Sequence, residues 1–275
     1  MPELPEVETV KRTLQPKLAG LTFTDVQIFL PKIIRTPEPE EFKAKLINKK
    51  IVKVNRRGKY LLINLNGGLN LAVHLRMTGS LVYCEPDKPL SKYTHLILSL
   101  SNNSQLRFAD MRQFGRIWLV PDTSMNDLAG YKDLGIEPLD NLFTKGFLKK
   151  ELRRRHVRIK PLLLDQTFIA GLGNIYTDEV LHRAKINPER LATTLSPREI
   201  ARLFHAIQEV LQEGIENRGT TVRDFIDGDG RAGNYQEFLQ VYNREGKPCC
   251  HCSQNILRKK VCGRSTYFCP SCQKI

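Results

Sequence analysis

Residues 59–75 read KYLLINLNGGLNLAVHL, two short and largely apolar runs on either side of Asn66-Gly67-Gly68. An Asn-Gly pair between two such runs is typical of a tight β-hairpin turn. Five further stretches between residues 22 and 120 are similarly short, rich in β-branched residues and partly alternating: TFTDVQIF, KIVKVNRR, YTHLILSL, QLRFAD and RIWLV. Several short antiparallel strands within about 100 residues predict a β-sandwich or a flattened barrel.

A helix is expected ahead of these strands. Its apolar residues recur at helical spacing, as Val7, Val10, Leu14 and Leu18. Pro5 suits an early helical position, and Gly20 is a suitable stop. Pro16 has no backbone N–H to donate, so the last helical turn is expected to be distorted.

Beyond the strands the pattern becomes helical. Residues 122–145 have little periodicity and are expected to form a linker. Two helical stretches flank the tight turn AGLGN at residues 170–174, and SPRE at residues 196–199 is a capping box before a long amphipathic helix. Residues 219–234, called here the glycine-rich loop, are expected to be mobile. The sequence therefore predicts a multidomain α+β protein.

The net charge narrows the class of partner. The 275 residues include 43 Lys and Arg against 29 Asp and Glu, a formal charge of +14. Such an excess favours a polyanionic partner, either a nucleic acid or an acidic membrane surface. Residues 145–160 carry eight cationic side chains and a single Glu, a run that equally suits a solvent-exposed face.

Other features argue against a membrane-spanning or exported protein. No run approaches the roughly 20 consecutive apolar residues of a membrane-spanning helix. The opening MPELPEVETV has neither the basic leader nor the apolar core of a signal peptide. An odd number of cysteines argues against a disulfide framework, and Cys84 and Cys262 are expected to be small buried apolar residues. A cytoplasmic location with no membrane partner is expected.

Six of the seven cysteines fall in the last 27 residues. Cys249 and Cys252 form one CxxC pair, Cys269 and Cys272 form another, and 16 residues separate the pairs. This spacing is typical of a four-thiolate zinc site. Four thiolates leave no open coordination position, which predicts one structural Zn²⁺ per chain. The CH dipeptide inside the first pair, Cys250-His251, offers alternative ligands of lower rank.

The opening PELPEVETV at residues 2–10, the motif GNIY at residues 173–176 and the terminal cysteine pairs occur together in one known family. The chain resembles the bacterial formamidopyrimidine-DNA glycosylases over essentially its whole length. The resemblance implies four segments: an N-terminal catalytic β-sandwich domain with a leading helix at 1–121, a linker at 122–145, a helix-two-turns-helix DNA-binding domain with a lesion-capping loop at 146–235, and a zinc-finger β-hairpin at 236–275.

The implied activity is that of a bifunctional DNA glycosylase/AP lyase of base excision repair. Its substrates would be oxidised purines, such as 8-oxoguanine and formamidopyrimidines, in damaged double-stranded DNA. The resemblance further implies a monomer with one structural Zn²⁺, located in the cytoplasm at the bacterial nucleoid.

By this resemblance, Pro2 is the catalytic nucleophile once Met1 has been removed. A free α-amino group titrates near about 8, so a useful fraction is neutral at pH 7. Attack on C1′ of the deoxyribose displaces the base and leaves a Schiff base, which permits β- and then δ-elimination of the flanking phosphates. Glu3 is expected to move protons at the sugar, Glu6 to support the site, and Lys59 to contact phosphate and assist catalysis. Without the resemblance, the two glutamates would be interpreted as favouring the helix N-terminus through its dipole.

Met77, in HLRMTG, and Arg112 and Phe114, in DMRQFG, match the residues with which this family fills the gap left by an extruded nucleotide. Met and Phe side chains are suited to wedge into the base stack, and an Arg offers donors to the orphaned base. Considered singly, Met77 and Phe114 would be interpreted as core residues. The glycine-rich loop corresponds to the segment that closes over the flipped base, and its candidate base contacts are Thr220, Thr221 and Arg223.

Five further residues match family positions that contact the DNA backbone: His74, Lys160, Asn174, Tyr176 and Arg264. Backbone amides exposed at a helix N-terminus after the glycine turn would favour such contacts. His74 in an apolar strand would otherwise be interpreted as a core histidine. Ser265 stands where the family usually has glycine, which puts a close approach of that backbone to phosphate in question.

Two other functions stay open. An endonuclease VIII-type glycosylase would use the same chemistry on oxidised pyrimidines, but the PELPEVE opening and the gap-filling residues favour purines. A zinc-ribbon DNA-binding protein without catalysis would explain the charge and the cysteines, but it would leave the N-terminal proline and its two glutamates unexplained.

Overall fold

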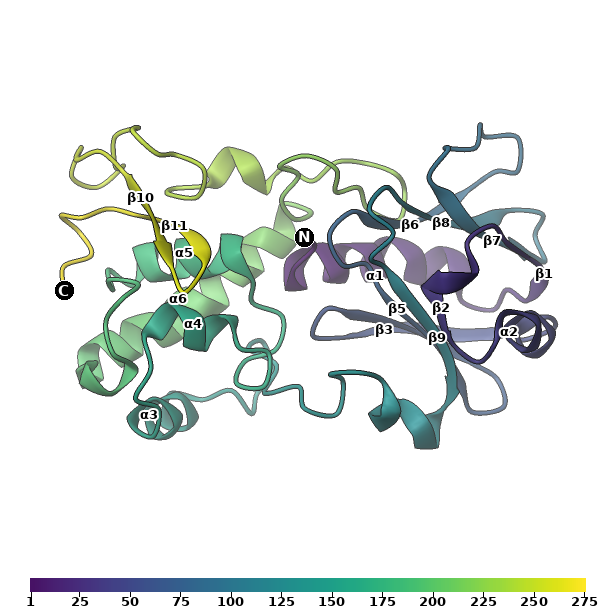
Figure 1. The fold of residues 1–275 in the computed structure, drawn as a ribbon, viewed down its shortest axis with the longest axis horizontal. Coiled ribbons are helices and arrows are strands. Elements are labelled where there is room, and N and C mark those ends of the chain that lie inside the picture. Colours follow the sequence, from purple (N-terminus) through teal and green to yellow (C-terminus); the bar gives the residue numbers. More distant parts are fainter. The chain divides into compact units, whose positions relative to one another are not determined.

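The computed structural model describes all 275 residues, which form two compact units. The first unit combines Met1–Lys132 with Asn217–Gln236. The second combines Asp133–Glu216 with Glu237–Ile275. The chain therefore leaves its first unit, builds most of the second, and returns to the first for one short segment that includes the glycine-rich loop (Figure 1).

Two β-sheets form the framework of the first unit (Figure 1). The four-stranded sheet has the order β1 (Phe23–Ile28), β7 (Thr94–Leu100), β8 (Gln105–Asp110) and β6 (Gly79–Cys84). The five-stranded sheet has the order β2 (Ile34–Thr36), β9 (Arg116–Pro121), β5 (Leu69–His74), β4 (Tyr60–Leu65) and β3 (Ile51–Arg57). Neighbouring strands are antiparallel except for β2 and β9, which are parallel.

One apolar core joins the two sheets. Phe108 of the four-stranded sheet and Ile63 of the five-stranded sheet belong to the same cluster of buried side chains, together with Val7 of the leading helix. The predicted β-sandwich is therefore confirmed. The predicted hairpin is also present, with Leu65 paired to Leu69 across two glycines that have positive φ.

The leading helix, α1, runs from Leu4 to Leu18 with its predicted apolar stripe fully buried. The backbone N–H of Glu3, the residue before the helix, donates to the Glu6 carboxylate at 2.7 Å. This bond occupies one of the donors that a helix N-terminus leaves free. Pro16 lies inside the last turn, and the helix still continues to Leu18.

Three elements of the first unit escaped the sequence analysis. Strand β2 has three residues and β6 (GSLVYC) begins at a glycine, so neither has a run long enough to show alternation. Helix α2 (Pro39–Leu46) buries only Phe42 and Leu46, too few positions for a helical period to be recognised.

The second unit is mainly helical, with α3 (Lys145–Arg153), α4 (Ile159–Leu164), α5 (Asn174–Arg183) and α6 (Pro197–Glu216). It ends in the hairpin β10 (Leu257–Val261) and β11 (Arg264–Phe268), which packs on α5. The predicted capping box is confirmed at α6, where Ser196 N–H donates to Glu199 at 2.8 Å. No helix of the chain has the length and apolar character needed to cross a bilayer.

Candidate functional site

Pro2, Glu3 and Glu6 lie together at the buried start of α1. The two carboxylate oxygens of Glu6 face different donors: Oε2 accepts from the Glu3 N–H and Oε1 accepts from the Thr220 N–H, both at 2.7 Å. Glu6 therefore connects the N-terminal segment to the first residues of the glycine-rich loop. Gly219 permits this approach, because it has φ +78° and a Cβ there would lie 2.8 Å from Glu6 Oε1.

Lys59 lies in the turn between β3 and β4 and is only 6% exposed. Helix α1 is fastened to β3 next to this turn, since Glu8 Oε2 lies 3.0 Å from Arg56 Nε. Burial works against ionisation of Glu8, but its bonds with Lys11, Arg56 and Arg12 outweigh this and lower its pKa. Glu8 therefore has a clear role in holding the helix on the sheet.

His74 ends β5 and pairs with Tyr60 of β4, whose ring contacts the imidazole edge-on at 4.8 Å. Burial, assisted by the charges of Arg76 and Lys59, lowers the pKa of His74 to about 3. Its Nδ1 accepts from the Arg76 N–H at 3.1 Å. The ring is therefore neutral at pH 7, and Nε2 carries its single proton.

The three predicted gap-filling residues lie in two loops that join the sheets at one end of the sandwich. One loop links β5 to β6 and holds Met77, and the other links β8 to β9 and holds Arg112 and Phe114. Met77 and Phe114 are 42% and 44% exposed, so neither is a core residue. The Arg112 guanidinium lies over the Phe114 ring at 4.8 Å.

Asp110, at the end of β8, connects these two loops and was missed by the sequence analysis. It is 1% exposed. One carboxylate oxygen accepts from the Thr78 hydroxyl and, at 3.1 Å, from the Arg112 N–H. The other accepts from the Gly115 N–H at 2.7 Å. An aspartate at a strand end carries no distinctive signal, so only its contacts reveal this role.

In the second unit, Asn174 and Lys160 meet at the finger hairpin. The Asn174 amide and the Lys160 ammonium both donate to the Ser265 carbonyl, at 2.9 and 3.0 Å. Lys160 also lies 2.7 Å from Asp178, and neither side chain of this pair has any exposed surface. Burial raises the pKa of Asp178 to about 7, although the Lys160 ammonium acts to lower it.

The residues that are predicted to contact the DNA backbone differ in the exposure of their side chains. Arg264, at the start of β11, is exposed, whereas Tyr176 and Lys160 are 0% exposed. The two buried side chains offer no donor to solvent. Their geometry suits support of α5 and of the hairpin rather than a direct contact with phosphate.

The three candidate residues of the glycine-rich loop also differ in their burial and hydrogen bonding. Thr220 is buried, while the Thr221 hydroxyl donates to the Phe225 carbonyl and accepts from the Gly233 N–H, both at 2.8 Å. Arg223 is exposed at the tip of the loop.

The four cysteines of the CxxC pairs come together at the end of the second unit, with all sulfurs within 4.8 Å of one another. Cys249 and Cys272 lie 4.0 Å apart, and Cys252 and Cys269 lie 3.4 Å apart. Thiolates that bind one Zn²⁺ tetrahedrally lie about 3.8 Å apart. Burial and the neighbouring thiols raise the pKa of Cys272, a crowding that a divalent cation would relieve. The cluster can therefore hold a metal such as zinc.

The histidine His182 of α5 adds a contact that the sequence did not indicate. Its Nε2 lies 3.4 Å from Cys249 Sγ, and it forms a second possible ligand group with Cys249 and Cys250. The other two cysteines differ from one another: Cys84 is buried as predicted, but Cys262 is exposed in the β10–β11 turn. The expectation that Cys262 is buried was wrong, because a two-residue hairpin turn offers no apolar core to bury its side chain.

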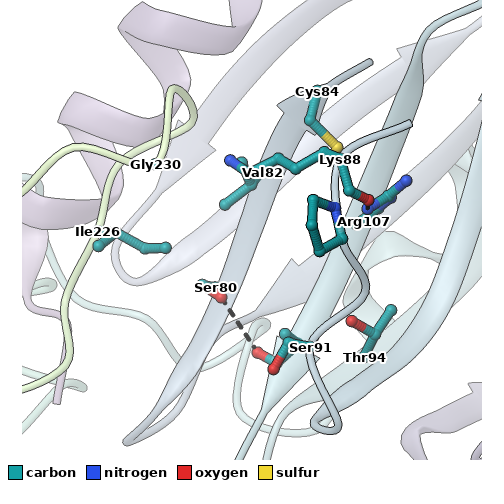
Figure 2. A pocket seen from close by; sticks show the side chains of 11 residues that line it. Ser80, Val82, Cys84, Lys88, Ser91, Thr94, Arg107, Ile226 and Gly230 are labelled. Carbon is teal, nitrogen blue, oxygen red and sulfur yellow. Dashed lines mark hydrogen bonds between the residues drawn. The ribbon is translucent and has the colours of Figure 1, made fainter. Parts of the chain in front are cut away.

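A small, mainly apolar pocket of about 160 Å³ lies elsewhere on the first unit (Figure 2). It is formed by strand residues such as Val82 and Ala109, with Ile226 and Gly230 of the glycine-rich loop on one side. None of the predicted catalytic residues lines it. The pocket and the candidate site are therefore separate features of this unit.

Two family domains match the chain. Residues 1–117 match the formamidopyrimidine-DNA glycosylase N-terminal domain, and residues 134–226 match the formamidopyrimidine-DNA glycosylase H2TH domain. The chain is 72% identical over 275 residues to the formamidopyrimidine-DNA glycosylase of Pelotomaculum thermopropionicum, with all of both chains covered. It is 57% identical over 275 residues to that of Desulforamulus reducens, covering 100% of this chain and 99% of the relative.

Solved structures of similar proteins hold damaged DNA. A Lactococcus lactis FPG mutant with Fapy-dG-containing DNA has a TM-score of 0.93 and 38% identity, with 100% of both chains covered. MutM in complex with DNA containing carbocyclic 8-oxo-G has a TM-score of 0.92 and 39% identity, again with 100% of both chains covered. The Lactococcus lactis Fpg with abasic-site DNA has a TM-score of 0.93 and 38% identity, covering 99% of this chain and 100% of that one.

Proposed function

The chain belongs to the formamidopyrimidine-DNA glycosylase family, and from this we propose that it excises oxidised purines from duplex DNA and then cleaves the strand. One observation supports this activity above all. Pro2 and two carboxylates, those of Glu3 and Glu6, are gathered at one buried helix start. A secondary amine beside proton-transfer groups is what amine-mediated base excision requires.

We propose that Pro2, freed by removal of Met1, forms a bond from its nitrogen to C1′ as the C1′–base bond breaks. The base leaves with the bonding electrons and takes up a proton, and the Pro2 nitrogen loses its own proton. The C1′–ring oxygen bond then breaks, the ring oxygen takes up a proton, and an iminium ion results. Loss of a C2′ proton to a base then expels the 3′ phosphate, and a second elimination expels the 5′ phosphate. Glu3 moves the proton at the ring oxygen, and Lys59 supplies positive charge to a phosphate.

Glu6 acts in this scheme as a positioning residue. Both of its oxygens are occupied by backbone donors, the N–H groups of Glu3 and Thr220. The carboxylate therefore fixes the residue that follows the nucleophile rather than serving as a free base.

We propose that Met77, Arg112 and Phe114 enter the duplex where the damaged nucleotide leaves it. Their exposure supports this role, since an exposed apolar side chain loses contact with water when it enters a base stack. Arg112 then donates to the base that has lost its partner. A similar Lactococcus lactis FPG structure contains DNA with an oxidised pyrimidine, so the test of the substrate includes such a duplex.

For the DNA backbone, we propose that Arg264, Asn174 and the Nε2–H of neutral His74 donate to phosphates. Lys160 and Tyr176 are proposed as supporting residues instead, because neither has any exposed surface, whereas His74 is 7% exposed. Thr220, Thr221 and Arg223 are proposed to lie over the extruded base. These assignments stay predictions at the level of single residues.

We further propose that Cys249, Cys252, Cys269 and Cys272 bind one structural Zn²⁺ per chain. When bound, the ion supplies the charge that four crowded thiolates need and cross-links the two ends of the finger. The four-segment division at 1–121, 122–145, 146–235 and 236–275 is also kept as a proposal, as are a monomeric state and a location at the bacterial nucleoid.

Borohydride trapping on a duplex with 8-oxoguanine opposite cytosine tests the activity. We expect a covalent adduct at residue 2 with the wild-type protein and a much weaker one with Pro2→Gly, because glycine replaces the rigid secondary amine with a primary amine on a more mobile backbone. Intact-mass analysis checks in parallel that Met1 has been removed; active protein that retains Met1 would contradict the proposed nucleophile.

The other outcomes decide between the alternatives. An adduct formed only on DNA with an oxidised pyrimidine would move the chain to the endonuclease VIII type. Tight binding to damaged and abasic DNA without any adduct would instead indicate a DNA-binding protein that does not catalyse base excision.

A further inference from the structure

The glycine-rich loop is fastened at its base to the rest of the first unit. The carbonyl of Gly219 accepts from the Tyr235 N–H at 3.0 Å, and the carbonyl of Asn217 accepts from the Asn234 N–H at 2.8 Å. The two arms of the loop are so close that a Cβ on Gly233 would lie 2.2 Å from the Gly219 carbonyl oxygen. The two arms of the loop are therefore held together at its base.

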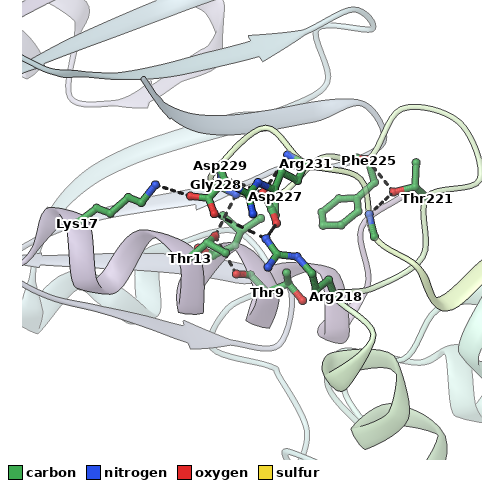
Figure 3. A network of polar contacts seen from close by, with 12 residues as sticks. Thr9, Thr13, Lys17, Arg218, Thr221, Phe225, Asp227, Gly228, Asp229 and Arg231 are labelled. Atoms are coloured by element: carbon green, nitrogen blue, oxygen red, sulfur yellow. Dashed lines mark hydrogen bonds and ion pairs between the residues drawn. The ribbon is translucent and has the colours of Figure 1, made fainter. Parts of the chain in front are cut away.

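The far side of the loop is bonded to helix α1 (Figure 3). The Gly228 N–H donates to the Thr13 hydroxyl at 3.0 Å, and a Cβ on Gly228 would lie 2.6 Å from the Leu14 side chain. Lys17 lies 2.5 Å from the Asp229 carboxylate. Helix α1, which carries Pro2 at its start, is thus in contact with the loop along its length.

Asp227 organises this contact. It is 0% exposed. Its Oδ1 accepts from the backbone N–H groups of Asp229 and Arg231, at 2.9 and 3.0 Å, and its Oδ2 forms an ion pair with the Arg218 guanidinium (Figure 3). A buried carboxylate that loses its donors is costly, so the turn at residues 227–231 and the position of Arg218 are held together.

The tip of the loop lies outside these bonds. Residues 222–224 are exposed, and the Thr221 hydroxyl closes their base by donating to the Phe225 carbonyl. The part of the loop that can adjust around an extruded base is therefore three residues long, with Arg223 at its centre.

We infer that Asp227 and Arg218 are positioning residues for base recognition, which anchor the glycine-rich loop on α1 and leave residues 222–224 as its adaptable tip. This inference rests on the proposed function. Neither residue touches the base. Together they set where the tip lies relative to the N-terminal amine, because the anchor is bonded to the helix that the N-terminal residues lead into.

Hydrogen exchange tests the anchor without reference to catalysis. In Asp227→Ala the amides of Asp229 and Arg231 lose their acceptor, and we expect faster exchange in residues 227–231 with unchanged exchange in the two sheets. Asp227→Asn keeps one oxygen for these amides and should show a smaller increase. Arg218→Met keeps the Asp227 carboxylate and removes the ion pairs of Arg218 with Asp227 and Asp229. Asp87→Asn, at an exposed aspartate after β6, is the matched control. Unchanged exchange in Asp227→Ala and Arg218→Met would overturn the inference.

Kinetics test the link to recognition. We expect Asp227→Ala to slow single-turnover excision of 8-oxoguanine by about 10- to 100-fold, the range typical of a misplaced positioning group. Strand cleavage at a preformed abasic site should stay close to the wild-type rate, because that substrate has no base for the tip to hold. Equal loss on both substrates, or no loss on either, would overturn the inference. If the wild-type protein acts on neither substrate, the proposed function fails, while the exchange experiment still decides whether the anchor exists.

Discussion

At the residue scale, the exposure or burial of a side chain decides which role it can have. Met77 and Phe114 are apolar yet exposed, and Lys160 is cationic yet fully buried. Leaving an apolar side chain in water gives up part of its hydrophobic stabilisation, and burying an ammonium requires a partner such as Asp178. Each of these residues departs from its usual environment, and each matches a position that the proposed function uses.

Asp110 gives a prediction at this scale. In Asp110→Asn the side chain presents an NH₂ group to one of its present N–H or O–H donors, which leaves a buried donor unpaired. We expect a loss of about 1–3 kcal/mol in the free energy of unfolding, measured by urea denaturation. Binding to damaged duplex should weaken as well, since one of the hydrogen bonds through which Asp110 holds the loops of Met77 and Arg112 is lost. The exposed Asp87→Asn should change neither property, and equal behaviour of the two variants would contradict the role of Asp110.

At the element scale, the second unit depends on the contact between α5 and the finger hairpin. Asp178 accepts from the Tyr267 N–H at 3.0 Å, and His182 reaches the sulfur of Cys249 at 3.4 Å. One face of α5 therefore contacts both the hairpin and the cysteine cluster, while its first residue, Asn174, is a proposed phosphate contact. Loss of the cluster is expected to disturb the hairpin that carries Arg264.

Metal removal tests this dependence. We expect one Zn²⁺ per chain to be released by a thiol-reactive mercurial with a zinc indicator. The stripped protein should lose DNA binding, because the finger folds around the ion. Its N-terminal amine should still be trapped by borohydride on a free abasic sugar, since Pro2 lies in the other unit. Retention of tight DNA binding after complete release of the metal would show that the ion is not needed for the interface.

At the scale of the whole molecule, the formal charge of +14 predicts strongly salt-dependent DNA binding. Each phosphate contact releases counterions, and loss of one contact lowers the slope of log affinity against log salt by about one. We expect this change in Arg264→Ala, whose side chain is exposed. Lys160→Met should instead lower the thermal midpoint and leave the slope unchanged, because its ammonium is buried against Asp178. A reduced slope in Lys160→Met would restore its prediction as a phosphate contact.

Much of the fold could be predicted because its signals are local. Seven strands, the leading helix, the capping box at Ser196 and the two cysteine pairs are patterns within a few residues to about twenty, and short-range spacing is what sequence periodicity records. Strand β2 has only three residues and α2 buries only Phe42 and Leu46, so neither left a pattern to detect. The order of the motifs along the chain also indicated the family that the domain matches now show.

The sequence by itself determined the strand and helix pattern, the cysteine cluster and the group of residues at the N-terminus. Only the tertiary structure decided which side chains are exposed and which bury a charge, and it alone revealed the roles of Asp110 and Asp227. The physical reason is the separation of the partners along the chain. Glu6 and Thr220 are 214 positions apart, and Lys160 and Ser265 are 105 apart. Such contacts form only when the whole fold brings their donors and acceptors together, and no local spacing encodes them.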